Sequence, residues 1–317
     1  MTAIQEALLT ERQLSPLTIL FGQDNGKYPS GNSLLIRGTK TAAIIDPSLG
    51  MVARKNQLPQ VDSVMHSHVH EDHVAGSHLF KDVPWFAHGL DLPGLASLDG
   101  MLDIYGFEGE LRQSFTQTVL NEFHYQSHED IHAFNDGDVF DFGGVRLTVM
   151  HTPGHTRGHC CFIIDWSADG KDPAQRLVYL GDIELTGFGP YYGDAWSDLE
   201  DFERSLKAIA EVDAQYWLTF HHKGLIESRA EFLPMLKQFT AMIDFREQNL
   251  LAFLAEPHTL DEIVDHRFVY RPGTGGVSVD VIERRSMGMH LARLLRDGAV
   301  RQVGDAYIRT AAAGVTP

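Results

Sequence analysis

Through its first two-thirds, the chain alternates short apolar runs with stretches whose apolar residues recur at helical spacing. Several apolar runs end in His or Asp, a pattern typical of strands that lead into functional loops. The predicted strands span residues 33–38, 41–48, 61–68, 145–155, 176–185 and 215–222. Residues 198–212 show helical spacing, and Asp198 can cap the start of that helix. Together these elements predict a layered α/β domain whose strand ends converge on one site.

The pattern changes in the last quarter of the chain, where helices dominate. The predicted elements there are helices at 241–256, 259–268 and 277–300 and a hairpin at 301–310. Thr259 and Glu262 match a capping box at the start of the second helix, and Gly298 closes the third. We therefore predict a catalytic domain at 1–240 and a small winged-helix-like C-terminal domain at 241–317.

Four histidines, one aspartate and one glutamate crowd into the segment MHSHVHEDHVAG, residues 65–76. Such side chains cost free energy when they are buried without partners, so the segment is either a polar surface loop or a cation site. In extended chain, residues two apart point the same way, so His68 and His70 can bind one ion together. Where the chain turns into a helix, adjacent side chains diverge by about 100°, so Asp72 and His73 can reach a second ion.

Three further motifs supply what two ions would still need. In HTPGHTRGH, a Pro-Gly turn presents His155 directly after a strand. Asp182 lies at a strand end in YLGDIEL, where one carboxylate can bridge two cations. TFHHKG offers His221, which we select as the ligand, and His222 as the alternative. Imidazole and carboxylate ligands suit zinc, iron or manganese.

In this order the motifs resemble those of the metallo-beta-lactamase superfamily of dinuclear metallohydrolases, over about residues 18–240. The resemblance implies a four-layer αβ/βα sandwich with the site at one edge. It also implies two divalent metal ions as cofactors, with zinc preferred and iron or manganese as alternatives. By this resemblance the first ion is held by His68, His70 and His155, the second by Asp72, His73 and His221, and Asp182 bridges both. His151 and His159 are either hydrogen-bond partners of these ligands or ordinary strand-end histidines.

Such a centre predicts hydrolysis, because two divalent ions lower the pKa of a shared water and supply hydroxide near neutral pH. This hydroxide can attack an acyl or phosphoryl centre, and Asp72 can orient it or pass a proton. In the aromatic-rich loop after the bridging aspartate, Tyr191 or Tyr192 could donate a hydrogen bond to a developing oxyanion. Phe188, Tyr191 and Trp196 could form an apolar acyl pocket, or they could only pack the loop down.

Composition indicates which partners and which cellular compartment to expect. The formal net charge of −17 would repel a phosphate backbone, so nucleic acid is not expected as a partner. Adjacent cysteines rarely form a useful cross-link, so Cys160 and Cys161 indicate buried side chains in a reducing compartment. Residues 1–16 are polar and helical in rhythm, without the features of a signal peptide. We therefore expect a cytoplasmic protein that does not bind a membrane.

The substrate class rests on the bridging residue and the tail. β-Lactamases of the superfamily commonly have cysteine at the bridging position, so Asp182 favours a resemblance to glyoxalase II, the thioesterases and the lactonases. Residues 241–317 resemble the winged-helix extension of related endoribonucleases, but nine arginines stand there against ten acidic residues, without a basic excess. We predict a hydrolase of a small thioester, lactone or other ester, with a tail that caps the substrate or supports a homodimer. The alternatives are a phosphodiesterase or endoribonuclease, an iron-dependent oxidoreductase that resembles persulfide dioxygenases, and a non-catalytic binding module.

Overall fold

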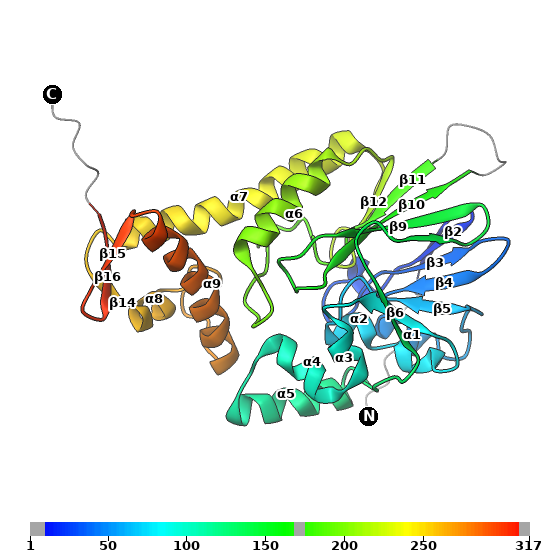
Figure 1. The fold of residues 1–317 in the computed structure, drawn as a ribbon, viewed down its shortest axis with the longest axis horizontal. Helices are drawn as coiled ribbons and strands as arrows, with labels where there is room; N and C mark the ends of the chain where they lie inside the picture. The colour runs from blue at the N-terminus through cyan, green and yellow to red at the C-terminus, as the bar shows by residue number, and fades with distance from the viewer. Residues whose placement is uncertain (1–9, 168–174, 311–317) are drawn as a thin grey trace.

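Two β-sheets lie face to face with helices on their outer faces in the computed structural model, which describes residues 10–167 and 175–310 (Figure 1). The first sheet contains, in spatial order, β1 (Glu11–Leu14), β2 (Leu17–Leu20), β3 (Ser33–Arg37), β4 (Ala42–Ile45), β5 (Ser63–Met65), β6 (Trp85–His88) and β7 (Ile131–Phe134). Strands β1 to β4 pair antiparallel, and β4 to β7 pair parallel.

The second sheet is largely antiparallel. Its order is β13 (Leu225–Ile226), β12 (Tyr216–Leu218), β11 (Gln175–Tyr179), β10 (Cys160–Trp166), β9 (Val145–His151) and β8 (Val139–Asp141). Among the described strands of this sheet, only β11 and β12 pair parallel. The predicted strands are all present, and the polar residues at their predicted ends lie in the loops that follow.

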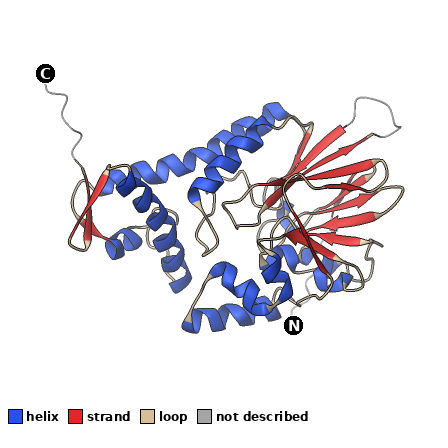
Figure 2. Cartoon of the chain, viewed as in Figure 1, coloured by secondary structure: helices blue, strands red, loops and turns tan. Residues whose placement is uncertain are grey.

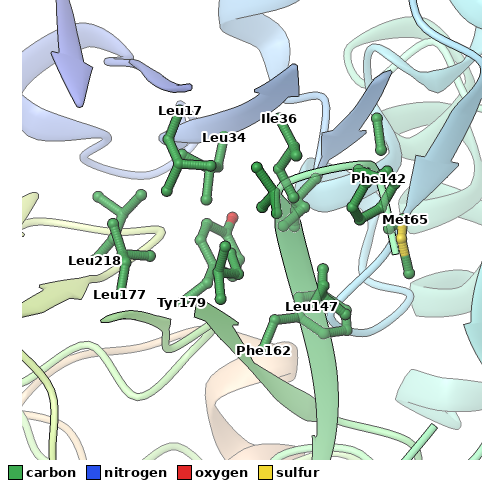
Figure 3. Close-up of a cluster of buried hydrophobic side chains, with 14 of the residues drawn as sticks. Leu17, Leu34, Ile36, Met65, Phe142, Leu147, Phe162, Leu177, Tyr179 and Leu218 are labelled. Atoms are coloured by element: carbon green, nitrogen blue, oxygen red, sulfur yellow. The ribbon is translucent and has the colours of Figure 1, made fainter. Parts of the chain in front are cut away.

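Side-chain alternation along the strands creates the layers. Leu34 and Ile36 of β3 point between the sheets, where they join a buried cluster with Leu147 and Phe162 of the second sheet (Figure 3). The intervening Leu35 points the other way, into a separate cluster under the outer helices. Because both faces of each sheet are covered, four layers result, with the strands as the two middle ones (Figure 2). The predicted αβ/βα sandwich is therefore confirmed.

Helices from two parts of the chain cover the sheets. The first sheet is covered by α1 (Leu49–Ala53), α2 (Glu71–Val74), α3 (Leu92–Ala96), α4 (Leu98–Tyr105) and α5 (Gly109–Asn121), with a short 3-10 turn at Ser77–Phe80. Another 3-10 turn, Gln23–Asn25, lies between β2 and β3 in sequence. The second sheet is covered by α6 (Leu199–Glu211) and the first half of α7 (Arg229–Phe253). The predicted cap of α6 is confirmed, since the Asp198 side chain accepts a hydrogen bond from the Asp201 amide.

Helix α7 begins 12 residues earlier than the predicted start at residue 241. Pro234 lies inside it and removes one helical hydrogen bond, which disfavours a helix at the level of local sequence. Burial of Phe232 and Phe239 against the second sheet outweighs that cost, and the Phe232 ring stacks on Trp217 at 3.6 Å. Residue 240 therefore lies within a continuous helix, and the division of the chain into two domains there stays a prediction.

The C-terminal elements follow the sequence pattern closely. They comprise α8 (Leu260–His266), α9 (Val277–Arg296) and a three-stranded sheet of β14 (His258–Thr259), β16 (Ala306–Arg309) and β15 (Val300–Val303). The capping box of Thr259 and Glu262 is present at the start of α8. Strands β15 and β16 form the predicted hairpin, with Gly304 in the left-handed conformation its turn requires. The winged-helix designation stays a prediction.

The predicted helical rhythm of residues 1–16 is wrong where the structure describes that segment. Residues 11–14 form strand β1, because pairing with β2 offers backbone hydrogen bonds that an isolated polar stretch lacks. Residues 1–9 lie outside the described part of the chain. Among the described residues, no helix combines the length and the apolar content that a membrane crossing requires.

Candidate metal centre

The loops that follow β5, β9, β11 and β12 meet at one edge of the sandwich, as the sequence pattern predicted. They bring together all seven predicted ligands. These side chains are almost completely buried, and they are His68, His70, Asp72, His73, His155, Asp182 and His221. Burial of so many polar groups costs free energy unless each finds a partner, so the partners of these groups decide what the site can hold.

Three imidazole nitrogens face one another in the first half of the site. His70 Nδ1 lies 3.1 Å from His68 Nε2 and 3.0 Å from His155 Nε2. One carboxylate oxygen of Asp182, Oδ2, lies 3.2 Å from the same His155 nitrogen. A tetrahedral zinc site with Zn–N distances of about 2.0–2.1 Å places its donor atoms roughly 3.3 Å apart. The observed separations are close to this value.

The second half of the site shares Asp182 with the first. The other carboxylate oxygen of Asp182, Oδ1, lies 2.9 Å from His73 Nε2, and Asp72 Oδ2 lies 2.8 Å from His221 Nε2. Asp182 therefore presents one oxygen to each half, which is the arrangement expected of a bridging carboxylate. His222 lies outside this group, with its Nε2 atom 3.9 Å from Glu184.

Each imidazole named below has one ring nitrogen anchored by the protein, which leaves the other nitrogen to face the centre. His73 Nδ1 contacts Asp46 at 2.9 Å, His155 Nδ1 contacts the Tyr191 carbonyl at 3.0 Å, and His221 Nδ1 contacts the Gly26 carbonyl at 2.7 Å. Since these acceptors require an N–H at the anchored nitrogen, the inward nitrogen of a neutral ring carries a lone pair. Lone pairs that converge on shared carboxylates form a donor set suited to divalent cations.

The electrostatics agree with this interpretation. Burial favours neutral His73, but the carboxylates of Asp182, Asp46 and Asp72 outweigh it and raise the pKa of His73 well above its ordinary value. Burial and the neighbouring His73 together lower the pKa of His68. The carboxylates around His73 thus attract positive charge strongly, while the His68 imidazole stays neutral. Cations bound between these groups would satisfy the carboxylates and leave the imidazoles neutral.

Several residues that support the centre escaped the sequence analysis. Asp46, at the end of β4, accepts hydrogen bonds from the Ser67 amide at 2.7 Å and the Tyr179 hydroxyl at 3.0 Å, in addition to its contact with His73. It is fully buried and adopts a left-handed conformation at a φ of 46°. The available signal was its position directly after a buried strand, the same signal that identified Asp182.

Asp91 and Asp194 hold the loops of the first half together. Asp91 accepts hydrogen bonds from the Thr156 hydroxyl at 2.7 Å and the Gly158 amide at 2.8 Å, which fixes the turn that carries His155. Asp194 Oδ2 lies 3.2 Å from His70 Nε2, and its other oxygen accepts a hydrogen bond from the Tyr191 hydroxyl at 3.1 Å. Each is a single acidic residue in a loop, so no spacing rule singles it out.

A buried carboxylate also stands between two tyrosines beside the centre. Glu71 accepts hydrogen bonds from Tyr28 at 3.0 Å and from Tyr105, whose ring stacks on His70 at 4.8 Å. Burial, followed by the charge of Asp72, raises the pKa of Glu71. Tyr105 ends α4, so this outer helix contacts the centre directly.

The two predicted oxyanion donors face different directions. The Tyr191 hydroxyl contacts Asp194, close to the first half of the site. The Tyr192 hydroxyl instead lies 3.0 Å from His290 of α9, and the side chain is 1% exposed. The catalytic roles of Asp72, Tyr191 and Tyr192 stay predictions, although the contact with His290 gives Tyr192 a structural partner.

Of the remaining residues that the sequence analysis singled out, some contact the donor set and others lie away from it. His159 Nε2 accepts a hydrogen bond from the Asp182 amide at 3.1 Å, so it supports the bridging residue. His151 stacks on His88 and contacts the Arg157 carbonyl, away from the donor set. The ring of Trp196 lies beneath the Arg157 guanidinium at 3.5 Å. Cys160 and Cys161 are buried free thiols, as predicted.

Comparison with known proteins places the chain in a family. The sequence profile described as the metallo-beta-lactamase superfamily matches residues 27–221, which include every predicted ligand. The chain belongs to the metallo-beta-lactamase superfamily. A solved metallo-beta-lactamase family protein from Thermus thermophilus has 22% sequence identity and a TM-score of 0.68, covering 94% of this chain and 99% of that one. At this identity the likeness supports the metallo-beta-lactamase fold alone.

Two curated relatives within the superfamily carry thioesterase names. The bovine protein (Bos taurus) named acyl-coenzyme A thioesterase MBLAC2 is 27% identical over 181 residues, which cover 50% of this chain and 61% of the relative. A Pseudocercospora fijiensis protein named atrochrysone carboxyl ACP thioesterase is 23% identical over 259 residues, covering 77% and 62% respectively. The chain thus spans less than two-thirds of the length of these superfamily members.

Proposed function

We propose that this protein is a metal-dependent hydrolase that cleaves a small thioester, with lactones and other esters as chemically related substrates. The observation that carries the proposal is the division of the donor atoms into two groups that share the Asp182 carboxylate. Membership of a superfamily of metallohydrolases and the names of the thioesterase relatives support it.

The donor set fits two divalent cations, with zinc preferred. His68, His70 and His155 would hold one ion, Asp72, His73 and His221 the other, and Asp182 would contact both. Bound divalent cations supply Lewis-acid chemistry, because they lower the pKa of water and polarise a carbonyl oxygen. The chain's own residues fix the geometry, since Asp46, Asp194 and two backbone carbonyls hold the imidazole rings in place.

Two side chains are assigned roles towards the substrate. Asp72, buried beside His221, would orient the attacking water and accept its proton. The Tyr191 hydroxyl donates its single proton to Asp194 in this structure, and it would turn from Asp194 to donate to the oxyanion that develops on the thioester carbonyl. Burial, followed by the charge of Asp194, raises the pKa of Tyr191, so this hydroxyl keeps its proton at neutral pH.

The arginines of α9 do not favour the nuclease alternative. Arg284 pairs with Asp261, Arg293 with Glu247 and Glu203, and Arg296 with Glu200. Paired guanidinium groups offer little net attraction to a phosphate backbone. The second alternative is an iron-dependent oxidoreductase. Metal analysis would distinguish it from the proposed hydrolase, because such an enzyme would hold one iron rather than two ions.

The neighbouring residues His221 and His222 provide a matched test. We expect about two metal ions per chain in the parent protein and about one in His221→Ala, with thioester turnover at least about 100-fold lower. His222→Ala should keep both the metal and the activity, because its imidazole lies outside the donor set. Equal metal loss in both variants would contradict the ligand assignment, and one iron per parent chain would contradict the hydrolase proposal.

A further inference from the structure

A groove with a volume of about 570 Å³ lies between α7 and residues 266–272, which connect α8 to α9. Met242, Phe245 and Phe253 line it from one face of α7, and Phe268 and Tyr270 line it from the connecting segment. Its volume falls within the range of small-molecule sites in proteins. Figure 1 shows that α7 runs from the sandwich to the C-terminal helices, and the lining residues place the groove along the second half of this helix.

The walls of this groove are accessible and mainly apolar, with Asn249, His266 and Arg271 as exposed polar residues of the lining. Phe245 is 53% exposed, which is unusual for an aromatic side chain on a packed helix. The guanidinium of Arg267, although part of the lining, is directed elsewhere, because it bonds to Asp280 and to the Thr274 carbonyl. Aromatic rings and a methionine make a surface that matches an alkyl chain better than a phosphate, which would require several unpaired cations.

The groove adjoins the loop that carries Tyr191. The ring of Tyr270 lies 5.7 Å from the ring of Phe188, which is itself 37% exposed. Met242 packs so closely under Gly189 that a side chain at that position would collide with it. Two residues beyond Gly189, Tyr191 binds Asp194 next to His70. Contacts therefore run from Tyr270 in the groove wall to Phe188, and through the loop of residues 188–191 to Asp194 and His70 at the first half of the metal centre.

The environment of Tyr270 supports this proximity. Burial, followed by the negative charge of Asp194, raises the pKa of Tyr270 to about 12. Asp194 contacts His70, so the groove wall lies within electrostatic reach of a residue beside the metal centre.

We propose that this groove receives the acyl chain of the substrate, so that α7 and the segment 266–272 select thioesters with medium or long alkyl chains. The proposal rests on the proposed thioesterase function. The reacting carbonyl would lie at the metal centre, and the chain would pass Phe188 and Tyr270 to contact Phe245. Residues of the C-terminal region would then contact the acyl chain and determine which chain lengths the enzyme accepts.

The test measures chain-length preference in thioesters that share one small thiol, such as N-acetylcysteamine. We compare kcat/KM for dodecanoyl and acetyl thioesters in the parent, in Phe245→Glu and in Gln248→Glu. Gln248 is an exposed residue of α7 outside the groove lining, so it controls for an added charge on this helix. We expect the dodecanoyl-to-acetyl ratio to fall about tenfold or more in Phe245→Glu, because an apolar contact is replaced by a charge. The ratio should not change in Gln248→Glu.

A binding measurement separates this proposal from the proposed function. Titration calorimetry with dodecanoate, the product acid, reports the groove without any turnover. If the protein cleaves no thioester, the proposed function fails, and loss of dodecanoate binding in Phe245→Glu would still support the groove. An unchanged ratio, or equal dodecanoate binding in both variants, would overturn the groove assignment. Dissociation of a dimer by Phe245→Glu, without a change in the ratio, would overturn it in favour of an interface between two copies of the chain.

Discussion

Arg246 joins the middle of α7 to the loop that carries Tyr191, although it is 1% exposed. Its two terminal nitrogens donate hydrogen bonds of 2.6 Å to the carbonyls of Pro190 and Phe188. The guanidinium also lies 5.2 Å from the Phe188 ring centre and 5.3 Å from that of Tyr192. A single buried side chain therefore fixes the loop between the groove and the metal centre.

The expected cost of Arg246→Met follows from these contacts. Methionine keeps most of the aliphatic volume but leaves one buried and one partly buried carbonyl without a donor. Hydrogen bonds to charged groups contribute about 1.5–3 kcal/mol each. Removal of the buried charge returns part of that sum, because burial of a guanidinium carries a desolvation cost. We expect a net loss of about 2 kcal/mol in the free energy of unfolding. With an unfolding entropy of about 2.1 cal/mol/K per residue over 317 residues, Tm should fall by about 3 °C.

Differential scanning calorimetry of the parent, Arg246→Met and Lys237→Met would measure this change. Lys237 is an exposed residue of the same helix and controls for the loss of a positive charge. Thioester turnover should fall in Arg246→Met as well, because the loop carbonyl of Tyr191 holds His155. An unchanged or higher Tm in Arg246→Met, relative to Lys237→Met, would refute the reasoning, since desolvation would then outweigh the hydrogen bonds.

Three further predictions concern the centre and its surroundings. Asp46→Asn should weaken zinc binding about 10- to 100-fold in a chelator competition, because the ring of His73 loses its charged partner; equal affinity would contradict this role. Arg285→Gln should lower kcat/KM about 2- to 30-fold, because Arg285 donates a hydrogen bond to the Tyr105 carbonyl and thereby fixes the ring that stacks on His70. Unchanged kinetics would show that α4 keeps its position without Arg285. Removal of metal by a chelator should abolish turnover reversibly and lower Tm by about 12 °C, the shift expected when each of two ions is present at about 1,000 times its dissociation constant. Turnover that survives chelation would exclude a metal-dependent reaction.

Much of the centre could be predicted because its donors follow local rules. The alternation of His68 and His70 along an extended segment, and the turn that follows, place side chains in directions that the backbone period determines. Asp182 and His221 follow strand ends, and the two sheets bring such ends together. The caps at Asp198 and Thr259 were equally predictable, since each depends on the three residues that follow.

The residues that support the donors could not be predicted in this way. Asp194 and Glu71 acquire their roles from partners distant in sequence, namely His70 and Tyr28, and no period links them. The start of α7 was predicted too late because Pro234 disfavours a helix locally, while the packing that compensates is tertiary. The partner of Tyr192 lies 98 residues further along the chain, on α9.

Helix α7 is continuous over 25 residues, a rod about 37 Å long at 1.5 Å per residue. One half is embedded against the second sheet, and the other half carries the groove and the packing surface of the C-terminal helices. Arg293 of α9 ties the rod to α6 through Glu247 and Glu203. The helix is packed at both ends and continues without a break through residue 240, so the structure offers no hinge loop at that position. If the groove receives the acyl chain as proposed, each further turn of α7 extends the wall available to that chain by about 5.4 Å, so side chains along one helix would set the chain length that fits.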